Sequence, residues 1–223
     1  MNYFSHGYRF VDDPYFVAGT AVPDWLSVAD RRVRARAARA KPLIDDPDPC
    51  LSAVARGVVQ HHHDDGWFHN TDAFNEVCWE VTARCRAALP PDEGFRPSFL
   101  GHILVEILLD DALAAADPSA LERYYAAMSK LDPVVVQAAV NQIAAVPTDR
   151  LAWFIGRFCN ERFLYDYAHD AKLLFRLNQV MRRVRLSRLP DSFQSVLPAA
   201  RRLVWARVSD LLKQDIPLRR AAG

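Results

Sequence analysis

The sequence has little glycine and contains no glycine-rich loop. Only 8 of its 223 residues are glycine. They form neither a Walker-type nor a dinucleotide-binding pattern, in which glycines let backbone N–H groups approach a phosphate. No G-x-S-x-G sequence marks a serine nucleophile on a tight strand-to-helix turn. These absences argue against the common nucleotide-binding folds and against an α/β-hydrolase.

The sequence also lacks cysteine motifs, a charge bias and a long apolar run. Its four cysteines have no C-x-x-C spacing and none adjoins a histidine, so we expect free thiols in a reducing compartment. The net charge of +1 gives no reason to expect nucleic-acid binding. No apolar run approaches the roughly 20 residues of a membrane span, and the N-terminus lacks the regions of a signal peptide. We therefore expect a cytoplasmic protein with no membrane span.

Helical spacing of apolar residues is present almost throughout the chain, and no alternating β-branched run competes with it. The length suits one sizeable core, so we predict one all-α domain, a helical bundle, over residues 1–223. Pro23 is expected to break the first helix and leave Asp24 as the cap of the next one. The predicted helices, most of which begin at Pro, Asp, Thr or Ser, cover residues 14–19, 31–41, 49–66, 72–89, 95–115, 118–131, 133–146, 149–167, 170–184 and 193–213.

A histidine-rich stretch at residues 60–69 is the most informative part of the sequence. It holds four of the seven histidines and two adjacent carboxylates. On a helix, His61, Asp65 and His69 share one face at i, i+4 and i+8. Imidazole and carboxylate together suit Mn, Fe or Zn better than Ca or Mg. The alternative interpretation is an exposed helix end whose carboxylates pair with nearby arginines.

A second polar row interrupts the most apolar predicted helix. His102, Glu106 and Asp110 also lie at i, i+4 and i+8, and polar groups in such a helix need partners. They form either a structural network or one wall of a polar pocket that faces the first row. Metal-assisted hydrolysis is the coherent chemistry for such a pocket. The predicted metal ligands are His6, Asp24, His61, Asp65, His69 and His102, and the predicted proton-transfer groups are Asp64, Glu106 and Asp110.

The basic stretch at residues 31–41 is predicted to be helical and has two interpretations. Runs of this kind are most often solvated helix faces. The functional alternative is a surface that docks an acidic partner or a phosphate-bearing ligand.

Several short motifs occur in the order seen in one known family. The opening Met1-Asn2-Tyr3-Phe4-Ser5-His6 is similar to M-N-aromatic-x-x-H, and Gly19 and Asp24 match G-x-x-x-x-D. Residues 57–69 resemble G-x-x-x-H-x-x-x-D-x-x-x-D, with His69 in place of the second Asp. His102 falls in a segment similar to D-H-F-L, and Tyr167 and Leu177-Asn178 stand at spacings similar to a late Y and L-N. The chain thus resembles the acyl carrier protein phosphodiesterase family, which is related in fold to HD-type metal phosphohydrolases.

This resemblance implies an all-helical HD-like fold, a divalent metal, commonly manganese, and hydrolysis of a phosphodiester. The donor types leave Fe or Zn as alternatives. The substrate it implies is the phosphopantetheine–serine linkage of acyl carrier protein. Gly101 and Ser27 depart from the family's Asp and basic residue, so the resemblance implies a retained site with changed ligands. The resemblance implies site roles for His6, Asp24, His61, Asp65 and His102. The site roles of His69, Glu106 and Asp110 are predicted from helix geometry alone. Two alternatives stay open, namely hydrolysis of nucleotide or phospholipid esters and a non-catalytic helical binding module.

Overall fold

The structure is a computed structural model that describes residues 1–91 and 93–212, and these residues contain helices and no strand. The predicted all-α class is therefore confirmed. The α-helices are α1 (Tyr3–Gly7), α2 (Pro14–Ala29), α3 (Ala37–Ala40), α4 (Pro49–Phe68), α5 (Asp72–Ala88), α6 (Pro97–Ala116), α7 (Pro118–Met128), α8 (Pro133–Ile143), α9 (Leu151–Glu161), α10 (Asp170–Arg183), α11 (Leu197–Ala206) and α12 (Val208–Leu211). Three short 3-10 helices, η1 (Lys41–Leu43), η2 (Phe163–Ala168) and η3 (Asp191–Val196), lie between them.

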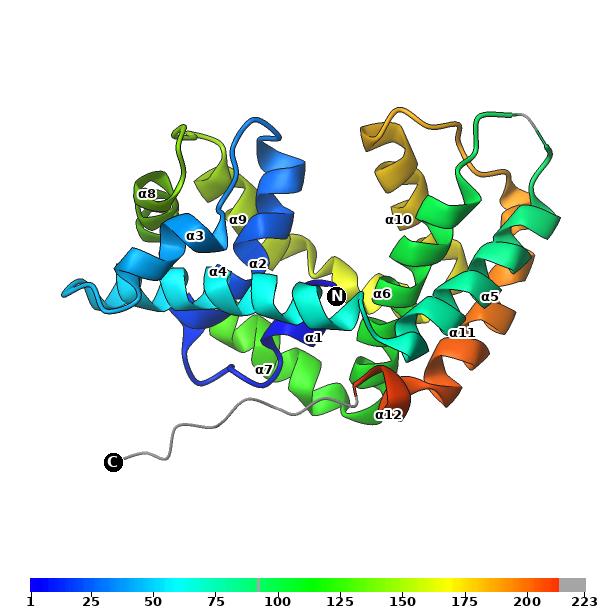
Figure 1. Ribbon diagram of the computed structural model, residues 1–223, viewed down its shortest axis with the longest axis horizontal. Coiled ribbons are helices and arrows are strands. Elements are labelled where there is room, and N and C mark those ends of the chain that lie inside the picture. The colour runs from blue at the N-terminus through cyan, green and yellow to red at the C-terminus, as the bar shows by residue number, and fades with distance from the viewer. Residues whose placement is uncertain (92, 213–223) are drawn as a thin grey trace.

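The helices form two groups joined by the long helix α4 (Figure 1). Helices α2, α3 and α8 pack on α4, while α5 and α11 pack on α6 in the second group. The short helix α1 contacts α2, α4 and α6, so the N-terminal residues lie near the junction of the two groups. The buried apolar side chains form one cluster that includes residues from both groups. No helix in the described ranges is long and apolar enough to cross a membrane.

Two glycines allow α2 and α4 to pack backbone against backbone. A β-carbon added to Gly57 would lie 2.2 Å from the Phe16 carbonyl oxygen, and one added to Gly19 would lie 2.3 Å from the Val54 carbonyl oxygen. Both distances are far below van der Waals contact, so neither position accepts a side chain unless the helices separate. This close packing holds the histidine-rich half of α4 against α2.

The predicted break at Pro23 is wrong, because α2 continues through this residue to Ala29. A proline inside a helix costs about 3 kcal/mol. Beyond the proline, however, α2 fully buries Trp25 and Leu26, and each such side chain contributes about 1.5–3 kcal/mol. Asp24 therefore lies inside α2 and does not cap a new helix.

The basic stretch at residues 31–41 is mostly not helical, which contradicts the prediction, since only Ala37–Ala40 are α-helical before η1. Val33 and Ala35 are buried and alternate with exposed arginines, which is the pattern of an extended segment. The Ala35 carbonyl accepts a hydrogen bond from His62 Nε2 at 2.8 Å. Burial and this tertiary contact outweigh the helical preference of alanine and arginine.

Two of the predicted C-terminal helices are shorter than expected. The helix predicted over 149–167 ends at Glu161, because Arg162 adopts a left-handed conformation with φ 44° and η2 follows. The left-handed residue is held by hydrogen bonds from its guanidinium to Glu122 and to the Tyr165 hydroxyl. The helix predicted over 193–213 is divided into η3, α11 and α12, and residue 213 lies outside the described ranges.

Candidate metal centre

The first group of possible ligands joins α1 to α4. His6 Nε2 lies 3.3 Å from Asp65 Oδ1, and His61 Nε2 lies 3.3 Å from Asp65 Oδ2. The two imidazole rings are stacked with their centroids 4.2 Å apart. One donor atom from each residue lies within 4.8 Å of the others, which is close enough for the three to bind one ion. The i, i+4 pair on α4 was predicted from its spacing, and α1 supplies the third donor.

The histidines of this group are oriented through their other ring nitrogens. His61 Nδ1 donates to the Thr20 carbonyl of α2 at 2.8 Å, and His6 Nδ1 lies 3.1 Å from Asp64 Oδ2. Gln60 Nε2 donates to the same carboxylate at 2.7 Å. Carbonyl and carboxylate partners of this kind orient metal-binding histidines in known sites. Asp64, predicted to transfer protons, contacts His6 through one oxygen and Gln60 through the other, and its proton-transfer role stays a prediction.

Electrostatics in the first group favour a proton on His6. His6 Nε2 is buried and makes no hydrogen bond within the described residues. Burial lowers the pKa of His6, but the nearby carboxylates of Asp64 and Asp65 outweigh burial and raise the pKa to about 9. His6 and His61 in turn hold the pKa of Asp65 well below its usual range, against the effect of burial. A cation that binds His6 must displace a proton.

The second group lies where the end of α4 meets α6. His69 Nε2 is 2.8 Å from Glu106 Oε1, and His102 Nε2 is 3.3 Å from the same oxygen. His69 is the residue that caps α4, so the chain leaves the helix there and its ring turns toward α6. Donor atoms of these three residues also lie within 4.8 Å of one another. Glu106, predicted to be a proton-transfer group, is here the carboxylate of a second possible metal site.

The positively charged N-terminal amine of Met1 lies between the two groups. The α-ammonium group of Met1 is 2.8 Å from Asp65 Oδ1 and 2.9 Å from Glu106 Oε1. Burial alone would lower the pKa of this amine, but Glu106 and Asp65 outweigh burial and raise the pKa to about 10. Because both carboxylates reach the same nitrogen, the two groups are adjacent parts of one centre. Of the predicted ligands, His6, His61 and Asp65 lie in the first group, His69 and His102 lie in the second, and Asp24 belongs to neither.

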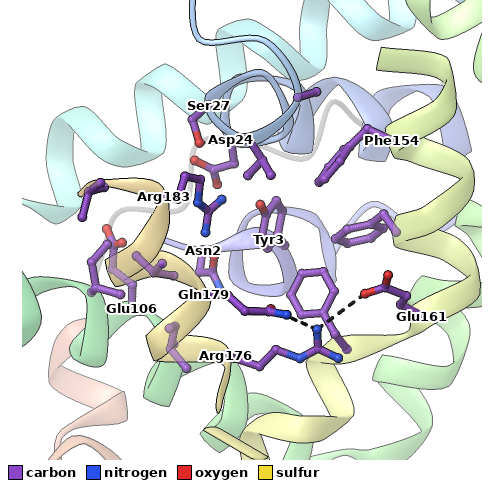
Figure 2. Close-up of a pocket in the computed structure, with 18 of the residues that line it drawn as sticks. Asn2, Tyr3, Asp24, Ser27, Glu106, Phe154, Glu161, Arg176, Gln179 and Arg183 are labelled. Atoms are coloured by element: carbon purple, nitrogen blue, oxygen red, sulfur yellow. Dashed lines mark hydrogen bonds and ion pairs between the residues drawn. The ribbon is translucent and has the colours of Figure 1, made fainter. Parts of the chain in front are cut away.

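Glu106 and Met1 also line a cavity of about 920 Å³ between α2, α6, α9 and α10 (Figure 2), and these two residues connect the centre to that cavity. Asp24 lies in its wall, and Asp24 Oδ2 is enclosed without a hydrogen-bond partner among the described residues. Burial raises the pKa of Asp24. Aromatic side chains from α1, α9 and η2 line another part of the cavity. The lining also includes the arginines Arg31, Arg34, Arg157, Arg176, Arg182 and Arg183.

Asp110, predicted to transfer protons, faces the start of α1 instead. Asp110 Oδ2 accepts from the Phe4 N–H at 3.0 Å and from Asn2 Nδ2 at 2.9 Å, and Oδ1 accepts from the Ser5 N–H at 2.7 Å. The carboxylate therefore takes the place of an N-cap for α1. Burial raises the pKa of Asp110 to about 6, although these hydrogen bonds oppose the shift. Asp110 thus acts on the centre by placing α1, which carries His6.

Replacing Asp110 with asparagine is expected to remove the pH dependence that this carboxyl gives to the free energy of unfolding, because an amide does not titrate. The folded carboxyl keeps its proton up to about pH 6, whereas the ordinary value is 3.8. Its contribution to stability is therefore complete below the ordinary value and is lost as the pH rises through 6. Urea unfolding of both proteins between pH 4 and 8 measures this, and parallel pH profiles would contradict it.

The chain was compared with known proteins. It matches no family model, no curated protein and no solved structure. The resemblance to acyl carrier protein phosphodiesterases and the HD-like detail of the fold thus stay predictions. The structure does explain one departure from that pattern, because a β-carbon on Gly101 would lie 2.1 Å from Thr82 Oγ1. Close packing of α5 on α6 leaves no room for a carboxylate there.

The sequence did not predict that Tyr3, Phe154 and Arg183 line the cavity. Arg183 stands in a basic run at the end of a predicted helix, where cations are common because they complement the helix dipole. Tyr3 and Phe154 have the appearance of ordinary core residues. Nothing in their local spacing indicates that these three residues line the same cavity as Asp24 and Glu106.

Proposed function

We propose that this protein is a metal-dependent phosphodiester hydrolase. The observation that supports it is the pair of adjacent His-His-carboxylate groups, one of whose carboxylates, Glu106, also lines a cavity with several arginines. Nitrogen and oxygen donors in this proportion suit Mn, Fe or Zn. His6, His61 and Asp65 would hold one ion, and His69, His102 and Glu106 a second. When bound, such ions neutralise charge on phosphoryl oxygens and lower the pKa of a water molecule.

Asp24 is the best-placed group to accept a proton in this reaction. Glu106 contacts His69, His102 and the Met1 amine, and both oxygens of Asp64 are occupied. Asp24 Oδ2 has no such partner, and burial raises the pKa of this carboxyl toward the range useful for general base catalysis. We assign to Asp24 the proton that the attacking water loses. This role replaces the metal-ligand role predicted from the sequence.

The shape and lining of the cavity suit a diester with one apolar arm. Arginines attract the phosphate, while Phe154 and Phe163 offer an aromatic surface in another part of the cavity. The phosphopantetheine–serine linkage of acyl carrier protein, which the sequence resemblance implies, combines a phosphodiester with a long arm. We propose this linkage as the first substrate to test. Nucleotide and phospholipid diesters are the second class, since they share both features.

Elemental analysis and a substrate panel test the proposal. We expect the purified protein to bind as many as two equivalents of Mn, Fe or Zn and to cleave bis(p-nitrophenyl) phosphate. A chelator should remove this activity, and added metal should restore it. Holo acyl carrier protein, a cyclic nucleotide and a lysophospholipid then separate the substrate classes. A protein that binds no metal above trace level and cleaves no diester is not this hydrolase.

A further inference from the structure

Arg183 differs from the other arginines inside the cavity. It is the last residue of α10 and is half-buried, and no described residue forms a hydrogen bond or ion pair with its side chain. Arg157 and Arg176 line the same cavity, but Glu161 pairs with both and Asp166 also pairs with Arg176. Arg31, Arg34 and Arg182 are exposed. Arg183 is thus a partly desolvated cation that has no counter-ion among the described residues.

The guanidinium of Arg183 points into the part of the cavity that Asp24, Asn2 and Tyr3 line. Figure 2 shows it beside Asp24 and Asn2, with Tyr3 and Glu106 on either side. Burial raises the pKa of the Tyr3 hydroxyl and the charge of Arg183 opposes that shift, so the two groups are close enough to interact. Asp24 shares this space, yet no hydrogen bond joins it to Arg183 and Asp24 Oδ2 stays unpartnered. The space between these groups and the centre is where a reacting phosphate would lie.

An unpaired guanidinium in such a place favours an anion. Arginine stays protonated at any physiological pH, so it cannot relieve its desolvation by losing the charge. Its planar N–H groups match two oxygens of a phosphate. We propose that Arg183 binds the non-bridging oxygens of the substrate's phosphate group, opposite the metal centre. This assignment rests on the proposed hydrolase function and adds a substrate-binding residue that α10 brings to the site.

Anion binding by variants at this position tests the assignment. Arg183→Met removes the charge at similar volume, Arg183→Lys keeps the charge without the fork, and Arg86→Met removes an exposed arginine of α5 outside the cavity. Titration calorimetry with inorganic phosphate gives Kd for each manganese-loaded protein. Steady-state rates with bis(p-nitrophenyl) phosphate give kcat and KM.

For Arg183→Met we expect Kd for phosphate and KM for the diester to rise about ten- to a hundredfold, the effect of losing charge-assisted hydrogen bonds. The change in kcat should be smaller, and Arg183→Lys should fall between wild type and Arg183→Met. Arg86→Met should behave as wild type. Metal content by elemental analysis should be equal in all four proteins.

Unchanged phosphate Kd and diester KM in Arg183→Met, with metal content intact, would overturn the assignment. If Arg183→Met does not fold by circular dichroism, Arg183→Lys decides, because wild-type Kd and KM in that variant also overturn it. Failure of the hydrolase proposal has a different signature, namely no diester cleavage by the wild type. In that case loss of phosphate binding in the Arg183 variants still supports the anion site.

Discussion

Replacing His61 with alanine is expected to remove one of two bound metal ions and to lower phosphodiester hydrolysis by about a hundredfold or more. Loss of a residue that only orients a ligand already costs about 10–100-fold in metal affinity or activity, and His61 is itself a proposed ligand. Its Nε2 faces Asp65 at 3.3 Å while Nδ1 is held by the Thr20 carbonyl. Elemental analysis after dialysis and rates with bis(p-nitrophenyl) phosphate measure the two effects.

The next residue in the sequence provides a matched control. His62 is also on α4, but its Nε2 donates to the Ala35 carbonyl at 2.8 Å and it belongs to neither metal group. His62→Ala should therefore lose about 1 kcal/mol of stability and keep both metal equivalents and the activity. If the two variants retain equal metal and equal activity and differ from wild type only in stability, the histidines form a structural network. That result would favour the non-catalytic binding module.

Placing alanine at Gly57 is expected to destabilise the protein by about 1–3 kcal/mol or more. The new methyl group would lie 2.2 Å from the Phe16 carbonyl oxygen and 2.7 Å from the Gly19 α-carbon. Backbone atoms cannot move aside as a side chain does, so α2 and α4 must separate. His61 stands one turn further along α4, and separation would break its hydrogen bond to Thr20. Urea unfolding followed by circular dichroism gives the stability, and metal analysis shows the effect on the centre.

Gly66 is the control for the intrinsic preference of the helix. It lies on the same helix α4, is exposed, and a β-carbon there meets no atom within 4 Å. Gly66→Ala should leave stability unchanged or raise it by about 0.5–1 kcal/mol, because alanine is the better helix former. Equal stability of Gly57→Ala and Gly66→Ala would show that close packing of α2 on α4 does not limit the fold.

Local sequence patterns determined the all-α class and the two i, i+4 pairs of the centre, His61 with Asp65 and His102 with Glu106. Helices were predicted to begin at residues 49 and 72, and the side chains of the preceding residues, Asp48 and Thr71, accept hydrogen bonds from N–H groups of α4 and α5 respectively. The row of His61 and Asp65 follows from the 3.6-residue period, because residues four apart share a face whatever the helix packs against. His102 and Glu106 lie side by side on α6 for the same reason, as their spacing predicted.

Tertiary structure alone decided which groups meet. His69 keeps the spacing of the first row, but α4 ends at Phe68 and the ring of His69 joins His102. Burial of Trp25 carries α2 through Pro23 and so places Asp24 in the cavity wall. Arg183 reaches that cavity only because α10 packs beside residues far away in the sequence. Periodicity describes one helix at a time, whereas contacts between helices depend on the shapes of both surfaces.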